Sequence, residues 1–108
     1  MKIVNLTPHK LVLMNEDLSV TAEIEASGQV ARVATRAVKV DETPEGVPLY
    51  RTEYGAVEGL PAPQDGVIYV VSGLVRAAVG DSRPDVYSPG KLVRDDAGQP
   101  IGAVGLTR

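Results

Sequence analysis

The stretch from Gly66 to Gly80, GVIYVVSGLVRAAVG, constrains the fold of this chain most strongly. Residues 67–71 are apolar at every position, which is typical of a strand that is buried on both faces. Ser72 follows as a candidate N-cap, and the apolar spacing after it predicts a short helix over Gly73–Val79 that stops at Gly80. The sequence therefore predicts a buried strand that leads directly into a helix.

The composition favours a β-rich core. The 108 residues include 17 Val but no Phe and no Trp, so the core must be aliphatic, and valine is more at ease in strands than in helices. A chain of this length suits one domain, residues 1–108. We therefore predict an α+β fold, in which a twisted, mainly antiparallel sheet of six to eight strands packs against the helix.

Most of the remaining chain reads as short strands between turns. Residues 18–25 alternate apolar and polar side chains, whereas 30–40 loses this phase, which predicts a bulge or bend. Ser27-Gly28, between these two strands, predicts a hairpin turn. The expected strands are 2–6, 10–14, 18–25, 30–40, 47–53, 67–71, 91–95 and 101–106. Three stretches rich in acidic residues, Gly or Pro are expected to be irregular loops: 41–46, 54–66 and 81–90.

Charge and composition exclude several classes of function. The net charge is −3 and no run of Lys or Arg is present, so we expect no nucleic-acid partner. With no Cys and a single His, we expect no metal site and no cofactor. The N-terminal apolar residues are interrupted by Pro8, His9 and Lys10, so we expect no membrane span and a cytoplasmic protein.

The segment around the single histidine is the first candidate site. His9 can act as a general base or donate a hydrogen bond to an anionic ligand, with Asn5 and Thr7 orienting that ligand from the same turn. The alternative is a turn at the end of a strand, whose polar side chains bind the local backbone. No neighbouring residue orients the imidazole as a base would require, so the sequence favours the structural role over catalysis.

A second group of candidates surrounds the predicted helix. Ser72 lacks the flanking glycines of a nucleophile elbow, so an N-cap that can also bind an anion is the preferred interpretation. Arg83 follows the helix in a loop and can either cover the helix start or pair with Asp81 or Asp85. Arg32, on the bent strand, is a supporting candidate.

Several segments share the pattern of one family. They are VNLTPH at 4–9, GAVEGLPAPQ at 55–64, GVIYVVS at 66–72, RPDVY at 83–87 and VRD at 93–95. Together they resemble a family of small proteins of phages and of bacterial genomes that carry prophages. The resemblance implies a phage or prophage accessory protein that acts in the cytoplasm. Small phage proteins of this size include inhibitors that sequester nucleotide immune signals, usually as oligomers.

The leading hypothesis is therefore a protein that binds a small anionic ligand, such as a cyclic nucleotide or an ADP-ribose derivative. Exposed strand edges and a small core favour a homo-oligomer. One alternative is an enzyme that cleaves such a nucleotide with His9 as general acid or base, and another is a structural or protein-inhibitory module. The residues expected to line the ligand site are Asn5, Thr7, His9, Arg32, Ser72 and Arg83.

Overall fold

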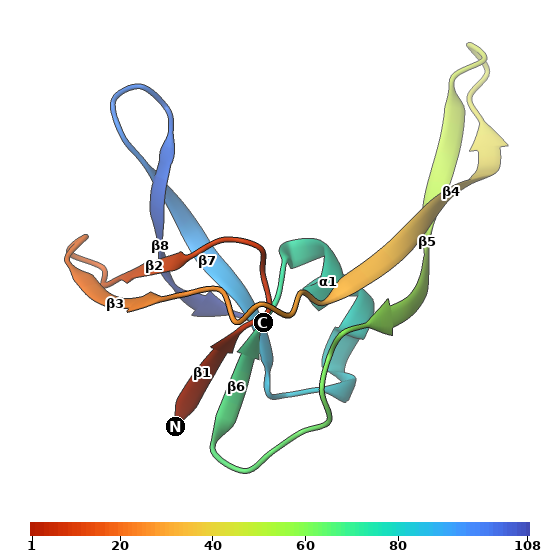
Figure 1. The fold of residues 1–108 in the computed structure, drawn as a ribbon. Helices are drawn as coiled ribbons and strands as arrows, with labels where there is room; N and C mark the ends of the chain where they lie inside the picture. The colour runs from red at the N-terminus through yellow and green to blue at the C-terminus, as the bar shows by residue number, and fades with distance from the viewer.

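The computed structural model describes all residues 1–108 (Figure 1). It contains eight strands, one α-helix and one 3-10 turn. The elements are β1 (Lys2–Asn5), β2 (Leu11–Met14), β3 (Val20–Ile24), β4 (Arg32–Glu42), β5 (Pro48–Glu58), β6 (Val67–Val70), α1 (Gly73–Val79), η1 (Gly80–Ser82), β7 (Val86–Arg94) and β8 (Pro100–Thr107).

Six strands form one sheet in the order β1-β6-β7-β8-β2-β3, and β4 and β5 form a separate two-stranded sheet. The β2–β3, β7–β8 and β4–β5 pairs are antiparallel and contain most of the paired residues. The β1–β6, β6–β7 and β2–β8 pairs are parallel. The predicted α+β fold, β-rich with one short helix, is confirmed.

The strand β6 is buried on both faces, as its apolar sequence predicts. Tyr69 packs in a cluster that includes Val75 of α1, whereas Val70 packs on the other face with Leu11 and Leu13 of β2. Full burial of an aliphatic side chain stabilises a fold by about 1.5–3 kcal/mol. β6 therefore joins the core beneath the helix to the core beneath β2.

The predicted helix is also confirmed, with both of its caps. Ser72 Oγ accepts a hydrogen bond from the backbone N–H of Val75 at 3.3 Å. Gly80 closes the helix at φ 64°, where a side chain would be strained, and its N–H donates to the carbonyl of Arg76. Strand, cap and helix thus form one continuous unit.

The three predicted loops, 41–46, 54–66 and 81–90, are each partly wrong, because a strand extends into each of them. β7 already begins at Val86, inside the predicted loop 81–90, and pairs there with β6 and then with β8. β4 and β5 continue through the expected loops as far as Glu42 and Glu58. The cause is pairing to a partner strand, which keeps the backbone extended where local composition favours a turn.

The predicted hairpin at Ser27-Gly28 is wrong as well, because β3 and β4 belong to different sheets. The segment is held instead by β1 and the turn that follows it. The N–H of Ser27 donates to the carbonyl of Asn5, and the N–H of Ala31 donates to the carbonyl of Leu6. The expected irregularity in strand 30–40 is confirmed, because β4 shifts register against β5 at two places.

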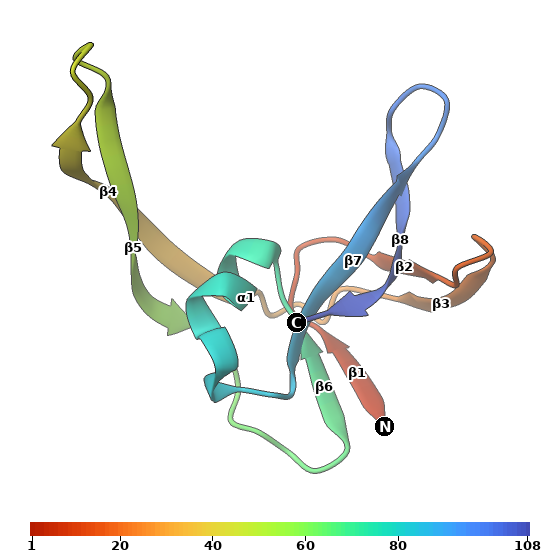
Figure 2. The same cartoon turned by 180° about the vertical axis from the view of Figure 1, so that it is seen from behind.

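The pair β4–β5 projects from the rest of the molecule, with its base beside α1 and its tip far from the six-stranded sheet (Figures 1 and 2). We call residues 32–58 the arm. Val33 and Val57 at its base pack on the helix-side core, whereas most of its other residues are exposed. The structure contains no helix with the length and apolarity that a membrane span requires.

Candidate functional site

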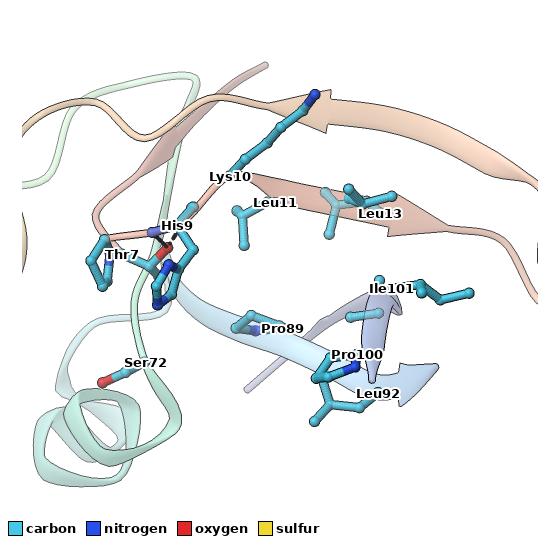
Figure 3. A pocket seen from close by; sticks show the side chains of 14 residues that line it. Thr7, His9, Lys10, Leu11, Leu13, Ser72, Pro89, Leu92, Pro100 and Ile101 are labelled. Carbon is cyan, nitrogen blue, oxygen red and sulfur yellow. Dashed lines mark hydrogen bonds between the residues drawn. The ribbon is translucent and has the colours of Figure 1, made fainter. Parts of the chain in front are cut away.

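A groove of about 610 Å³ runs along β2, between the turn that precedes this strand and the β7–β8 hairpin (Figure 3). We call it the β2 groove. The segment 7–13 forms one wall, the β7–β8 hairpin forms another, and Ser72 lies at one end. Its lining residues are Thr7, Pro8, His9, Lys10, Leu11, Val12, Leu13, Ser72, Pro89, Leu92, Pro100, Ile101, Gly102 and Ala103.

Asn5 is almost fully buried, with 1% of its surface exposed, and it organises the turn that leads into the groove. Its Nδ2 donates to the carbonyls of His9 at 2.7 Å and Ile24 at 3.1 Å. Its Oδ1 accepts from the backbone N–H of Thr7 at 2.9 Å. The amide is therefore saturated by the backbone, and Asn5 acts as a positioning residue beneath the site rather than as a ligand contact.

Thr7 completes this network. Its Oγ1 lies 2.7 Å from Asn5 Oδ1 and 3.0 Å from the carbonyl oxygen of His9. These contacts fix the backbone of residues 5–9 in a tight turn. The structural role expected for Asn5 and Thr7 is therefore observed, and it determines where His9 lies.

His9 is exposed, and its imidazole lies at the end of the β2 groove between Thr7 and Ser72 (Figure 3). Its backbone carbonyl takes part in the turn, whereas its ring makes no hydrogen bond to the protein. A ring in this position has a free donor and a free acceptor for a molecule in the groove. No carboxylate orients it in the manner of a catalytic base.

Lys10 lines the groove with its backbone and stem, but its charge is used elsewhere. Its side chain points away toward β3 (Figure 3), where Nζ lies 3.0 Å from Glu23 Oε1 and 3.6 Å from Glu25 Oε1. The hydrogen bond to Glu23, followed by the charges of Glu23 and Glu25, raises the pKa of Lys10. These carboxylates offset its attraction for an anion in the groove.

Ser72 lies near His9 at the same end of the groove, although the two come from distant parts of the sequence. Its hydroxyl is already the acceptor of the helix N-cap bond. The same hydroxyl still has a proton that it can donate. In Figure 3 the hydroxyl points toward α1 and away from His9, so the role that the structure shows for it is the helix cap.

Arg83 does not line the groove. Its guanidinium donates to both carboxylate oxygens of Asp85 at 3.0 Å and to the carbonyl of Pro61 at 2.8 Å. It also lies 5.9 Å from the centre of the Tyr69 ring. Of the alternatives that the sequence leaves open, pairing with Asp85 is the one observed.

Arg32 lies at the base of the arm, opposite Glu58, and likewise outside the groove. Of the six candidate residues, the structure brings Thr7, His9 and Ser72 together at the groove, with Asn5 beneath the turn. Arg32 and Arg83 lie apart from them. The two sequence motifs NLTPH and VVS therefore meet in space.

Sequence reasoning missed the apolar side of the groove. Pro89, Leu92, Pro100 and Ile101 of the β7–β8 hairpin form it, and Leu92 and Ile101 are about half exposed. The only signal was the presence of the large aliphatic residues Leu92 and Ile101 in the two strands expected at 91–95 and 101–106. Exposed aliphatic side chains beside a polar end can hold the flat, apolar part of a small molecule.

Among known proteins, no family model, curated protein or solved structure matches this chain. The structure also contains no group of three or more His, Asp or Glu side chains that could hold a metal ion. The side chains that line the β2 groove are therefore the features of this chain that point to a function.

Proposed function

We propose that this protein binds and sequesters a small, anionic, nucleotide-derived molecule in the β2 groove. The observation that carries the proposal is the union of an apolar wall with a polar end formed by His9 and Ser72. The volume of about 610 Å³ falls in the range of small-molecule sites, roughly 300–1,000 Å³. A mononucleotide or dinucleotide derivative has dimensions of this order.

The apolar wall suits a nucleobase. Leu92, Pro100 and Ile101 lie on the side of the groove away from the His9 end (Figure 3). Aliphatic and prolyl surfaces pack against the face of a base without the need for a specific hydrogen bond. Burial of this surface contributes about 25 cal/mol for each Å² removed from water.

The polar end suits a phosphate or ribose oxygen. The ring N–H of His9 and the hydroxyl proton of Ser72 are donors of the right kind. Because Lys10 is the only lysine or arginine that lines the groove and its charge is offset by Glu23 and Glu25, the electrostatic attraction in this groove is modest. The ligand is therefore held by packing together with a few hydrogen bonds rather than by a cluster of cations.

The resemblance to small phage and prophage proteins gives the biological setting of the proposal. A phage accessory protein that sequesters a nucleotide immune signal needs binding without turnover, and the unoriented imidazole of His9 suits binding better than catalysis. We extend the proposal to action in the cytoplasm of the host, where such a signal is made.

The test is incubation of purified protein with cyclic dinucleotides, cyclic ADP-ribose and ADP-ribose, followed by equilibrium dialysis. Heat denaturation and mass spectrometry of the released molecule then show whether it is intact. Sequestration predicts depletion of one ligand and its recovery unchanged. Recovery of a cleaved product would instead establish the enzyme alternative, and no depletion of any of these ligands would reject the proposal.

Variants locate the site. His9→Ala and Leu92→Glu, on opposite sides of the groove, should each weaken binding about tenfold or more, which corresponds to about 1.4 kcal/mol. Arg32→Ala lies outside the groove and serves as the matched control, with affinity expected to stay unchanged. A loss of binding in Arg32→Ala but not in His9→Ala would place the site on the arm instead.

A further inference from the structure

The chain exposes more surface than a compact monomer of its size. Its solvent-accessible surface is 7088 Å², whereas a compact protein of 11.4 kDa exposes about 5,800 Å². Its radius of gyration is 16.6 Å, against about 13 Å expected. The arm and the β7–β8 hairpin both project from the molecule (Figure 1), and the excess of about 1,300 Å² over the whole chain is larger than the roughly 800 Å² that each partner buries in a standard interface.

One face of the arm carries charged side chains that form ion pairs with one another. Arg36, Val38, Arg51 and Glu53 share this face, because Arg36 pairs with Glu53 and Val38 pairs with Arg51 across the strands. Glu53 forms salt bridges with Arg36 at 2.6 Å and with Arg51 at 2.9 Å. The ion pairs of this charged face are suited to contact with water, although Leu49, two residues before Arg51 on this face, is also 43% exposed.

The opposite face is nearly uncharged. It consists of three cross-strand pairs, and we call it the tyrosine face: Thr35 with Tyr54, Ala37 with Thr52, and Lys39 with Tyr50. Tyr50 is 60% exposed and Tyr54 is 44% exposed. The only charge, on Lys39, is paired with Glu42 at 2.9 Å.

We propose that the tyrosine face docks on the same face of a second copy of this chain, so that two arms pack together about a two-fold axis. An isolated two-stranded sheet is marginally stable in water, and this one lacks a covering layer over most of its length. A two-fold interface requires a patch that is complementary to itself. The proposal stands independently of any ligand in the β2 groove.

The tyrosine face has this self-complementarity. Tyr50 and Tyr54 both lie on β5, opposite Lys39 and Thr35 of β4, so a two-fold axis parallel to the strands places the rings of one arm over the β4 side of the other. A buried tyrosine removes roughly 150–250 Å² from water. The face contains no unpaired charge that would meet its own copy across the axis.

Sedimentation equilibrium over a range of protein concentrations tests the proposal. The unmodified chain should have twice its mass of 11.4 kDa. Thr52→Glu, which places a charge at the centre of the tyrosine face, should raise the dimer dissociation constant at least tenfold. Arg51→Glu is the matched control on the charged face: it changes the net charge by more, yet should leave the dimer intact.

A monomeric unmodified chain would overturn the proposal, and so would equal behaviour of Thr52→Glu and Arg51→Glu. Because Thr52→Glu can also affect the fold of the arm, a second test uses the absence of cysteine in this chain. Ala37→Cys should be joined into a covalent dimer by a short bis-maleimide reagent, whereas Arg36→Cys, on the opposite face, should not. Failure of Ala37→Cys to cross-link, or equal cross-linking of both, would also refute the arrangement.

Discussion

Arg83 and Asp85 form a bidentate ion pair two residues apart, with both N–O distances at 3.0 Å and more than four-fifths of each side chain buried. The pair fixes the segment between η1 and β7. Through the bond from Arg83 to Pro61, it also ties this segment to the loop before β6. Of the two roles that the sequence leaves open for Arg83, covering the start of the helix or pairing with a nearby aspartate, the structure shows the second.

The stability of the protein should fall in acid because of this pair. The hydrogen bond from Arg83 holds the pKa of Asp85 below its ordinary value of 3.8. Because the folded-state pKa is lowered, this contribution is fully present above the unfolded-state pKa and is lost as the pH falls through the folded-state pKa. Arg83, whose pKa is raised by Asp85, stays charged throughout.

Urea denaturation between about pH 3 and pH 7 measures the effect. Asp85→Asn should lower the free energy of unfolding by about 1–2 kcal/mol at neutral pH and remove part of the decrease in acid. Asp81→Asn, at an exposed carboxylate in η1, should change neither the free energy of unfolding at neutral pH nor its decrease in acid. If Asp85→Asn is as stable as the unmodified protein, the ion pair does not support the fold.

The turn before β2 should depend on the hydroxyl of Thr7. Thr7→Val keeps the shape but removes the bonds with Asn5 and His9, so the free energy of unfolding should fall by about 1–2 kcal/mol. Thr7→Ser retains the hydroxyl and should lose less than half of that. Thermal denaturation of both variants makes the comparison, and a loss in Thr7→Ser with none in Thr7→Val would assign the effect to the methyl group instead.

Gly90 should be essential to the β7–β8 hairpin. A Cβ at this position would collide with the carbonyl oxygen of Val104 and lie 3.0 Å from that of Gly105. Gly90→Ala should therefore cost about 3 kcal/mol or more. Gly73→Ala is the control, since its Cβ meets no atom within 4 Å, and it should be neutral or slightly stabilising. Chemical denaturation that ranks the two in the reverse order would contradict the β7–β8 register.

Ser72 offers a way to separate capping from ligand binding. Ser72→Ala should cost about 1 kcal/mol of stability through loss of the N-cap bond to Val75. Ser72→Asp keeps an acceptor and should preserve stability. Its negative charge should nevertheless weaken a bound nucleotide about tenfold, as measured by calorimetry. Unchanged affinity in Ser72→Asp would show that the anionic group lies elsewhere.

Local chemistry predicted the parts of this fold that depend on neighbours in sequence. The apolar run 67–71, the Ser72 cap and the Gly80 stop lie within one short segment, so each signal was readable. The same holds for the mixed phase of residues 30–40, which corresponds to the register shifts of β4.

Features that depend on distant pairing escaped prediction. Pro89 and Gly90 indicate a loop, yet both lie within β7. Because β6 ends opposite Tyr87, β7 beyond that point pairs only with β8 and tolerates a residue without an N–H. The parallel pairing of β1 with β6 joins segments more than 60 residues apart, for which no local pattern exists.

The site shows the same limit. Asn5, Thr7 and His9 were found because they share one turn, and Ser72 because it begins a helix. The aliphatic wall was not predicted, because Leu92 and Ile101 line the groove only once β8 has paired with β2. Arg83 was predicted to contact the ligand, but its guanidinium is bonded to the carboxylate of Asp85 and does not line the groove.

The order of the six-stranded sheet has a consequence for how the chain matures during translation. β1 and β3, both from the first quarter of the chain, are the two edge strands, and β6, β7, β8 and β2 lie between them in the sheet order. The β2–β3 hairpin therefore has no sheet to join until β8 has left the ribosome. A nascent chain halted before Pro100 can pair β1 with β6 and β2 with β3, but it lacks the strand that joins the β2–β3 hairpin to β7. The β2 groove is therefore assembled only in the final step of synthesis.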